Sequence, residues 1–127
     1  MGESWTFEKE PESLTPDSVV DELRARIGRG ALEWWLTSSS GRFLAFVTNT
    51  ERAMVVLLDG EGDPGEHAVT PGAEGVSDGF VLSNGQYDEY PDADTVPLAE
   101  GYRIVRHILA HGTPPPDAPW TIDREPT

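Results

Sequence analysis

Asp59, Glu61 and Asp63 place carboxylates at alternate positions of a Gly-rich segment, as a calcium-binding loop does. The calcium-loop pattern also requires a glycine for the tight turn and a glutamate at the twelfth position. Pro64 and Thr70 occupy those two positions here. The sequence therefore predicts a solvated acidic loop rather than a calcium site.

Two other groups lack the residues that would complete a catalytic site. His107 and His111 have a metal-binding spacing, but Ile108 stands where a zinc peptidase carries its general base. Ser38–Ser40 lack the Gly-x-Ser-x-Gly elbow of a serine hydrolase, and no phosphate-binding or dinucleotide-binding glycine pattern occurs. The chain has no Cys, which excludes a thiolate nucleophile. We expect a protein that is not an enzyme and needs no cofactor or metal.

Negative charge is the strongest signal in the sequence. The 127 residues include 23 acidic and nine basic ones, for a net charge of −14. Residues 53–102 contain no Lys or Arg, which predicts an uncompensated acidic surface. Such a surface repels nucleic acid and anionic membranes and attracts basic proteins. The partner predicted by this charge is a basic protein domain.

Two acidic segments of this stretch form the predicted contact surface. The second segment, residues 86–94, combines acids with two tyrosines, and tyrosine is a frequent anchor at interfaces. The alternative is a solvated loop whose acids favour the N-terminus of the next helix. The predicted contact residues, with the last five at the centre, are Asp59, Glu61, Asp63, Glu66, Asp88, Glu89, Tyr90, Asp92 and Asp94.

Length and composition predict one folded domain. A chain of 127 residues with 37% hydrophobic residues and 9% aromatic residues can bury a core. No apolar run reaches the roughly 18–20 residues of a membrane span, and residues 1–10 lack the order of a signal peptide. We expect a cytoplasmic protein, and the sequence leaves a homodimer open.

Hydrophobic periodicity predicts an antiparallel meander between two helices. A helix is expected at 16–28 because Thr15-Pro16-Asp17 is a strong start signal. Strands are expected at 31–37, 42–48 and 53–58. The last two are apolar on both alternating faces, so we expect them to be central and covered on both sides.

Further along, residues 59–79 are expected to be mostly loop, with a short strand at 67–70. Asn84-Gly85 predicts a type I′ hairpin turn between 80–82 and 86–87. A helix follows at 97–111. The predicted fold is α+β, with a central antiparallel sheet built from the meander and the hairpin and packed by an N-terminal and a C-terminal helix. Residues 1–14 are expected to be a polar arm, either frayed or forming a short edge strand, 15–122 the domain and 123–127 a tail.

The chain resembles the first of the numbered bacterial immunity-protein families over about residues 30–122. The likeness rests on the two-Trp strand at Trp34-Trp35, Asn84-Gly85 with an acidic run, Val96-Pro97 before the last helix, and the stretch from Gly112 to Trp120. These motifs belong to the scaffold and identify no contact residue. Members of that family are small α+β proteins, common in actinobacteria and encoded beside polymorphic toxins, many of which are nucleic-acid deaminases.

The resemblance implies a non-enzymatic immunity protein that neutralises a cognate toxin. A toxin that acts on DNA or RNA needs a basic substrate surface, which an acidic protein can occlude. Two alternatives remain open. One is a small-molecule-binding or regulatory module, which a closed apolar pocket would indicate. The other is an acidic nucleic-acid mimic that inhibits a host enzyme.

Overall fold

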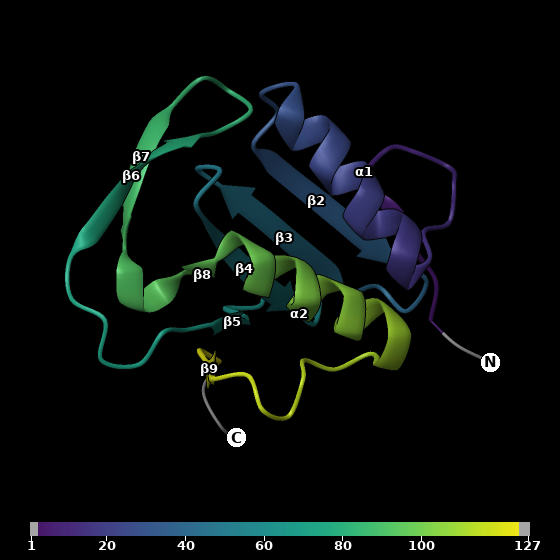
Figure 1. The fold of residues 1–127 in the computed structure, drawn as a ribbon. Helices are drawn as coiled ribbons and strands as arrows, with labels where there is room; N and C mark the ends of the chain where they lie inside the picture. The colour runs from purple at the N-terminus through teal and green to yellow at the C-terminus, as the bar shows by residue number, and fades with distance from the viewer. Residues whose placement is uncertain (1–2, 125–127) are drawn as a thin grey trace.

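A seven-stranded antiparallel sheet lies behind two helices in the computed structural model, which describes residues 3–124 (Figure 1). The sheet order is β1-β2-β3-β4-β5-β9, and β8 pairs with the first residues of β4. A separate hairpin consists of β6 and β7. The elements are β1 (Trp5–Phe7), α1 (Pro16–Gly28), β2 (Glu33–Ser38), β3 (Phe43–Thr48), β4 (Arg52–Leu58), β5 (Glu66–Ala68), β6 (Val76–Val81), β7 (Tyr87–Pro91), η1 (Asp92–Asp94), β8 (Val96–Pro97), α2 (Leu98–His111) and β9 (Trp120–Ile122).

The predicted meander is confirmed as β2, β3 and β4, and both predicted helices are present. The register aligns Trp34 with Phe46 and Phe46 with Val55, so these side chains share one face. That face packs against the helices and forms the main core. Trp35 points to the opposite face, as the alternation of a strand requires.

Helix α1 begins where the sequence predicted. The Thr15 hydroxyl accepts a hydrogen bond from the Ser18 N–H at 2.9 Å, and the Ser18 hydroxyl accepts one from the Thr15 N–H at 2.8 Å. This reciprocal capping satisfies two backbone donors at the start of the helix. The side chains that α1 buries are Val19, Leu23 and Ile27.

Helix α2 approaches β3 and β4 closely at Gly101. A Cβ atom there would lie 3.0 Å from Ala53 Cβ and 3.1 Å from Phe46 Cε2. The helix ends at Gly112, whose φ of 79° suits the left-handed cap that glycine adopts without strain. Gly101 therefore sets the distance between α2 and the sheet, and Gly112 ends the helix.

Segments at both ends of the chain lie against the main sheet. Of the two possibilities for residues 1–14, the structure has the short edge strand: β1 pairs with β2, and Trp5 is 1% exposed and Phe7 2% exposed. At the other end, the backbone N–H groups of Asp123 and Arg124 donate to the Gly65 carbonyl, so these two residues are attached to the sheet. The rest of the expected tail, 125–127, and residues 1–2 of the arm lie outside the described residues.

The hairpin is present, but its turn and length differ from the prediction. Gly85 has a φ of 87°, whereas Asn84 is not among the residues with positive φ, so the turn is not type I′. Leu82 and Gln86 instead flank a three-residue loop that ends in a left-handed glycine. Strand β6 begins at Val76, inside the segment expected to be loop, because Val76 pairs with Pro91 of β7. A bulge that includes Gly79 shifts the register between Ser77 and Phe80.

We expect Gly101→Leu to lower the free energy of unfolding by about 2 kcal/mol. Overpacking against Ala53 and Phe46 costs about 1–3 kcal/mol and outweighs the gain in helix propensity. The matched control is Ala99→Leu, at an exposed position of the same helix, which should change stability by less than about 0.5 kcal/mol. Urea unfolding of both variants measures the difference, and equal stabilities would contradict this account of the contact.

Candidate protein-binding surface

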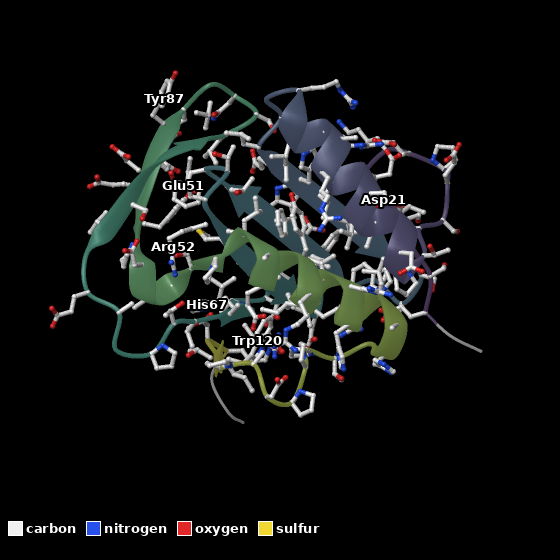
Figure 2. All side chains as sticks on the ribbon, in the orientation of Figure 1. Asp21, Glu51, Arg52, His67, Tyr87 and Trp120 are labelled. Carbon is white, nitrogen blue, oxygen red and sulfur yellow. The ribbon has the colours of Figure 1, made fainter. Side chains whose placement is uncertain are left out.

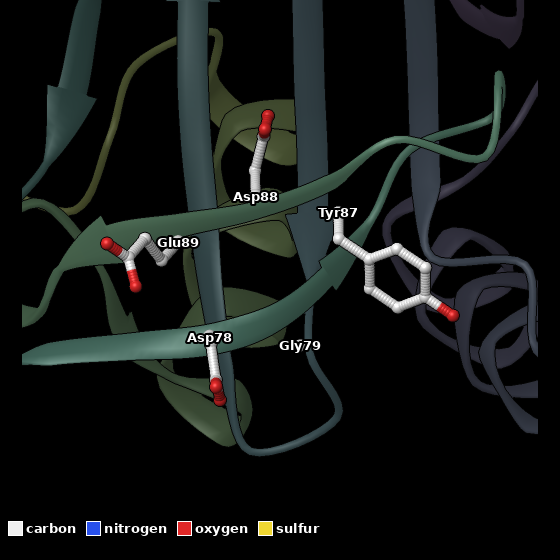
Figure 3. Close-up of a pocket in the computed structure, with 5 residues that line it drawn as sticks. All are labelled: Asp78, Gly79, Tyr87, Asp88 and Glu89. Carbon is white, nitrogen blue, oxygen red and sulfur yellow. The ribbon is translucent and has the colours of Figure 1, made fainter.

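The β6–β7 hairpin crosses the face of the main sheet that points away from the helices. Figure 3 views this side, with the hairpin in front of the strands and the helices behind them. The Asn49 side-chain amide donates to the Asp78 carbonyl at 2.9 Å, and the Ser83 N–H donates to the Glu33 carboxylate at 2.8 Å. These two contacts hold the hairpin near the ends of β2 and β3.

The two sides of the hairpin differ in character. Tyr87 is 78% exposed and points outward, and Glu89 is exposed as well. Phe80 is fully buried and its ring packs edge-on against Tyr90, with 4.9 Å between the ring centroids. The hairpin therefore has an apolar inner side and an acidic outer side that carries an exposed aromatic ring.

The hairpin contains an open depression of about 420 Å³, lined by Asp78, Gly79 and Asp88 together with the outward-pointing Tyr87 and Glu89 (Figure 3). Within residues 3–124, no Lys, Arg or His forms an ion pair with any of its three carboxylates. Their charge is therefore uncompensated and accessible from solvent. An arrangement of carboxylates beside a tyrosine can receive an Arg or Lys side chain through ion pairs and a cation–π contact.

The predicted anchor Tyr90 points inward. Its hydroxyl donates to Asp88 Oδ2 at 2.9 Å, and its ring contacts Phe80. Burial, together with the negative charges of Asp88 and Glu33, raises the pKa of the Tyr90 hydroxyl to about 12. The phenol therefore remains a neutral donor that orients Asp88, and the exposed ring of this strand is Tyr87.

Residues 59–66 are not the uncompensated surface that the sequence suggested. The Arg124 guanidinium lies 2.7 Å from Asp63 Oδ2 and 3.5 Å from Asp59 Oδ2, and it also pairs with Glu66. The hydrogen bond from Arg124 lowers the pKa of the Asp63 carboxyl to about 2. Of the four predicted contact residues in this segment, Glu61 alone has no ion pair among the described residues.

Asp92 and Asp94 also have internal partners. The Arg52 Nε atom lies 3.9 Å from Asp92 Oδ1, and the same guanidinium donates to Thr95 and Thr70. His67 Nε2 lies 3.0 Å from Asp94 Oδ1, and its Nδ1 lies 2.6 Å from Asp123 Oδ2. Through these contacts, Asp92 and Asp94 join η1 to β4 and β5 of the main sheet. His67 itself lies on β5 next to β9, the strand that carries Trp120 (Figure 2).

The candidate catalytic groups have structural roles where the structure describes them. Ser40 donates to Glu3, whose carboxylate pairs with Arg42, so the serine turn ties the N-terminal segment to β3. The His107 Nδ1 atom lies 2.7 Å from the Thr113 carbonyl oxygen, just past the end of α2. In the part of the chain from residue 3 to 124, no group of three or more His, Asp or Glu residues has an arrangement that could hold a metal ion. Over the same residues, no helix has the length and apolarity needed to span a membrane.

Asp78 and Tyr87 belong to the acidic stretch but are not among the contact residues that the sequence predicts. The alternation of Tyr87 and Glu89 with Asp88 and Tyr90 would have separated outward from inward residues if the segment had been assigned to a strand. The sequence of β7 does not predict a full strand, because its acidic residues and its proline are uncommon in strands.

Comparison of the chain with protein-family models, with curated proteins and with solved structures found no match.

The contact of His67 with two carboxylates predicts a pH-dependent stability. Burial disfavours the charged imidazole, but the hydrogen bonds to Asp123 and Asp94 outweigh that effect and raise the His67 pKa above its usual 6.5. A raised pKa contributes stability that is fully present below about pH 6.5 and is lost as the pH rises through the folded-state value.

We therefore expect His67→Gln to be destabilised relative to the native chain at pH 5.5, with a smaller difference at pH 8.5. Unfolding free energies measured in urea at both values test this expectation. A difference that stays constant or grows with pH would show that the imidazolium does not contribute in the way described.

Proposed function

We propose that this protein is a non-enzymatic immunity protein that binds and neutralises a basic toxin domain acting on nucleic acid, with a deaminase as the first candidate. The observation that carries the proposal is the β6–β7 hairpin, which presents Asp78, Asp88 and Glu89 around Tyr87 with no internal cation among the described residues. Three carboxylates held in one depression produce a directed negative field, which attracts basic partners at long range.

The chemistry of the partner follows from the charge. A protein that acts on DNA or RNA must present Lys and Arg to the phosphates, and the same groups can pair with carboxylates. An acidic hairpin bound over such groups would block the substrate without any catalysis. The resemblance to the first numbered immunity family, carried by Trp34-Trp35, Val96-Pro97 and the Gly112–Trp120 stretch, supports the same role.

The position of the acids revises the expected contact surface. Asp88 and Glu89 remain the proposed centre, and Asp78 and Tyr87 join them. The segments 59–66 and 92–94 stay predicted contacts of lower weight, because Arg124, Arg52 and His67 already neutralise much of their charge. A partner's Lys or Arg would have to displace Arg124, Arg52 or His67 from these acids. The free energy lost with the internal ion pairs would then cancel much of the free energy gained from the new ones.

The two alternative functions make different demands on the surface. A small-molecule site requires an enclosed, mostly apolar pocket, whereas the depression described on the hairpin is open and lined by three acids. A nucleic-acid mimic that inhibits a host enzyme would use the same acids as an immunity protein. The identity of the bound protein distinguishes these two functions, since an immunity protein requires the toxin domain encoded beside it.

The test uses a variant in which the three hairpin acids are neutralised, and measures its binding to the toxin domain and its protection of toxin-expressing cells. We expect Asp78→Asn, Asp88→Asn and Glu89→Gln together to slow association with the toxin domain roughly 10-fold at low salt, because exposed charges steer encounter. Toxin-expressing cells should lose protection. Stopped-flow association rates and survival after toxin induction measure the two effects.

The matched control neutralises Glu8, Glu12 and Asp21, three exposed acids outside the ion pairs of the described residues. Asp21 lies on α1, far from Tyr87 (Figure 2). This variant has the same net charge as the first and should change the association rate less than about 2-fold. Equal effects of the two variants would mean that net charge, and not the hairpin, determines binding.

A further inference from the structure

The middle of the sheet face that points away from the helices is apolar across β2, β3 and β4. Register places Trp35 beside Ala45, Ala45 beside Val56, and Val56 beside His67 of β5. None of its residues belongs to the core on the helix side. We call this set the apolar sheet face, and it consists of Trp35, Phe43, Ala45, Val47, Met54, Val56 and Leu58. The polar side chains on the same side of these strands lie at their ends and are Glu33, Thr37 and Arg52.

The hairpin covers one end of the apolar sheet face and leaves the rest accessible. Phe80 of β6 is fully buried although it lies outside the helix-side core, and β6 contacts β3. Beyond the hairpin, the larger side chains are half-buried, and both described helices pack on the opposite face (Figure 1). These accessible side chains are Trp35, Phe43, Met54, Val56 and Leu58.

Two carboxylates border this accessible area at the hairpin end, where Arg52 is already bound to Asp92 and Thr95. The Glu33 carboxylate accepts hydrogen bonds from the Ser83 N–H and from Trp35 Nε1. Asp88 lies on the same hairpin, where it pairs with Phe80. Neither carboxylate forms an ion pair among the described residues 3–124. An apolar surface with acids at one end complements a partner with an apolar centre and a basic end.

The apolar sheet face alone is too small for a stable protein interface, so a partner must also contact the surface beside it. The three strands of the apolar sheet face, each about six residues long and about 4.8 Å wide, span roughly 15 Å by 20 Å, or about 300 Å². A stable interface buries about 800 Å² on each partner. In Figure 3 the hairpin crosses in front of the strands of the main sheet, on the side away from the helices. A partner on that side can contact both the hairpin and the part of the sheet that the hairpin leaves uncovered.

We propose that the apolar sheet face and the adjoining hairpin form one docking surface for a basic partner, which lays an apolar segment over Val56 and directs Lys or Arg side chains at Glu33, Asp88 and Glu89. This proposal rests on the proposed function and specifies the chemistry of the partner's surface. A second copy of the chain is a poorer occupant, because a twofold pair would bring acidic borders together between molecules of net charge −14.

The test compares Val56→Asp with Ile122→Asp. Both residues are apolar, both lie on strands of the main sheet, and each substitution adds one negative charge. Ile122 is 63% exposed and lies on β9, outside the apolar sheet face. Calorimetry measures the affinity of each variant for the toxin domain encoded beside the chain.

We expect Val56→Asp to weaken binding about 30-fold or more, because a central interface residue contributes at least about 2 kcal/mol. Ile122→Asp should weaken it less than about 3-fold. Val56→Thr, which keeps the shape of the side chain, should show an intermediate loss and covers the case in which the aspartate variant does not fold. Equal affinities of Val56→Thr and the native chain, or equal effects of the two aspartate variants, would overturn the proposal.

A synthetic peptide separates this proposal from the proposed function. The probe alternates valine with threonine and carries two lysines at each end, and its control carries glutamates instead. The native chain should bind the lysine peptide, and Val56→Asp should not. If the toxin domain does not bind the native chain, the proposed function fails while peptide binding still supports the docking surface.

Three results would overturn the docking surface. The first is no binding of the lysine peptide to the native chain. The second is equal binding of that peptide to the native chain and Val56→Asp. The third is a dimer of the native chain, seen in sedimentation, that Val56→Asp dissociates and Ile122→Asp does not, because the face would then be occupied by a second copy.

Discussion

The central constraint on this structure is that strands β3 and β4 are apolar on both faces. A sheet strand of that kind must be covered on two sides or leave hydrophobic surface in water. Helices α1 and α2 cover one face, and Gly101 lets α2 approach β3 and β4 closely. The second face receives the β6–β7 hairpin over one end, so the covering of the sheet also positions the acidic surface.

The distribution of charge follows from this arrangement. Arg52 and Arg124 lie outside the stretch that lacks basic residues, yet their side chains reach back to Asp92 and Asp63. Those pairs attach η1 and the C-terminal segment to the sheet. The hairpin projects beyond the reach of these arginines, and its acids therefore keep their charge exposed. A single acidic stretch in the sequence becomes two regions of different character.

Together, the acidic hairpin and the apolar sheet face have the composition expected of a protein interface, with an apolar centre and a charged border. Charge on the hairpin favours fast encounter with a basic partner, and apolar contact favours a long-lived complex. Under the proposed function, the two surfaces would divide the work of fast encounter and slow dissociation between them.

The sequence by itself determined the helices, the meander and the acidic character, because capping at Thr15, alternation in 43–48 and 52–58, and missing basic residues are local properties. It did not determine β1 or the length of the hairpin, because Trp5 and Val76 become strand residues through pairing with distant segments. Tertiary structure alone decided which acids remain free. Ion pairs depend on distances between residues far apart in the chain, and Asp63 is neutralised by Arg124 while Glu89 has no such neighbour among the described residues.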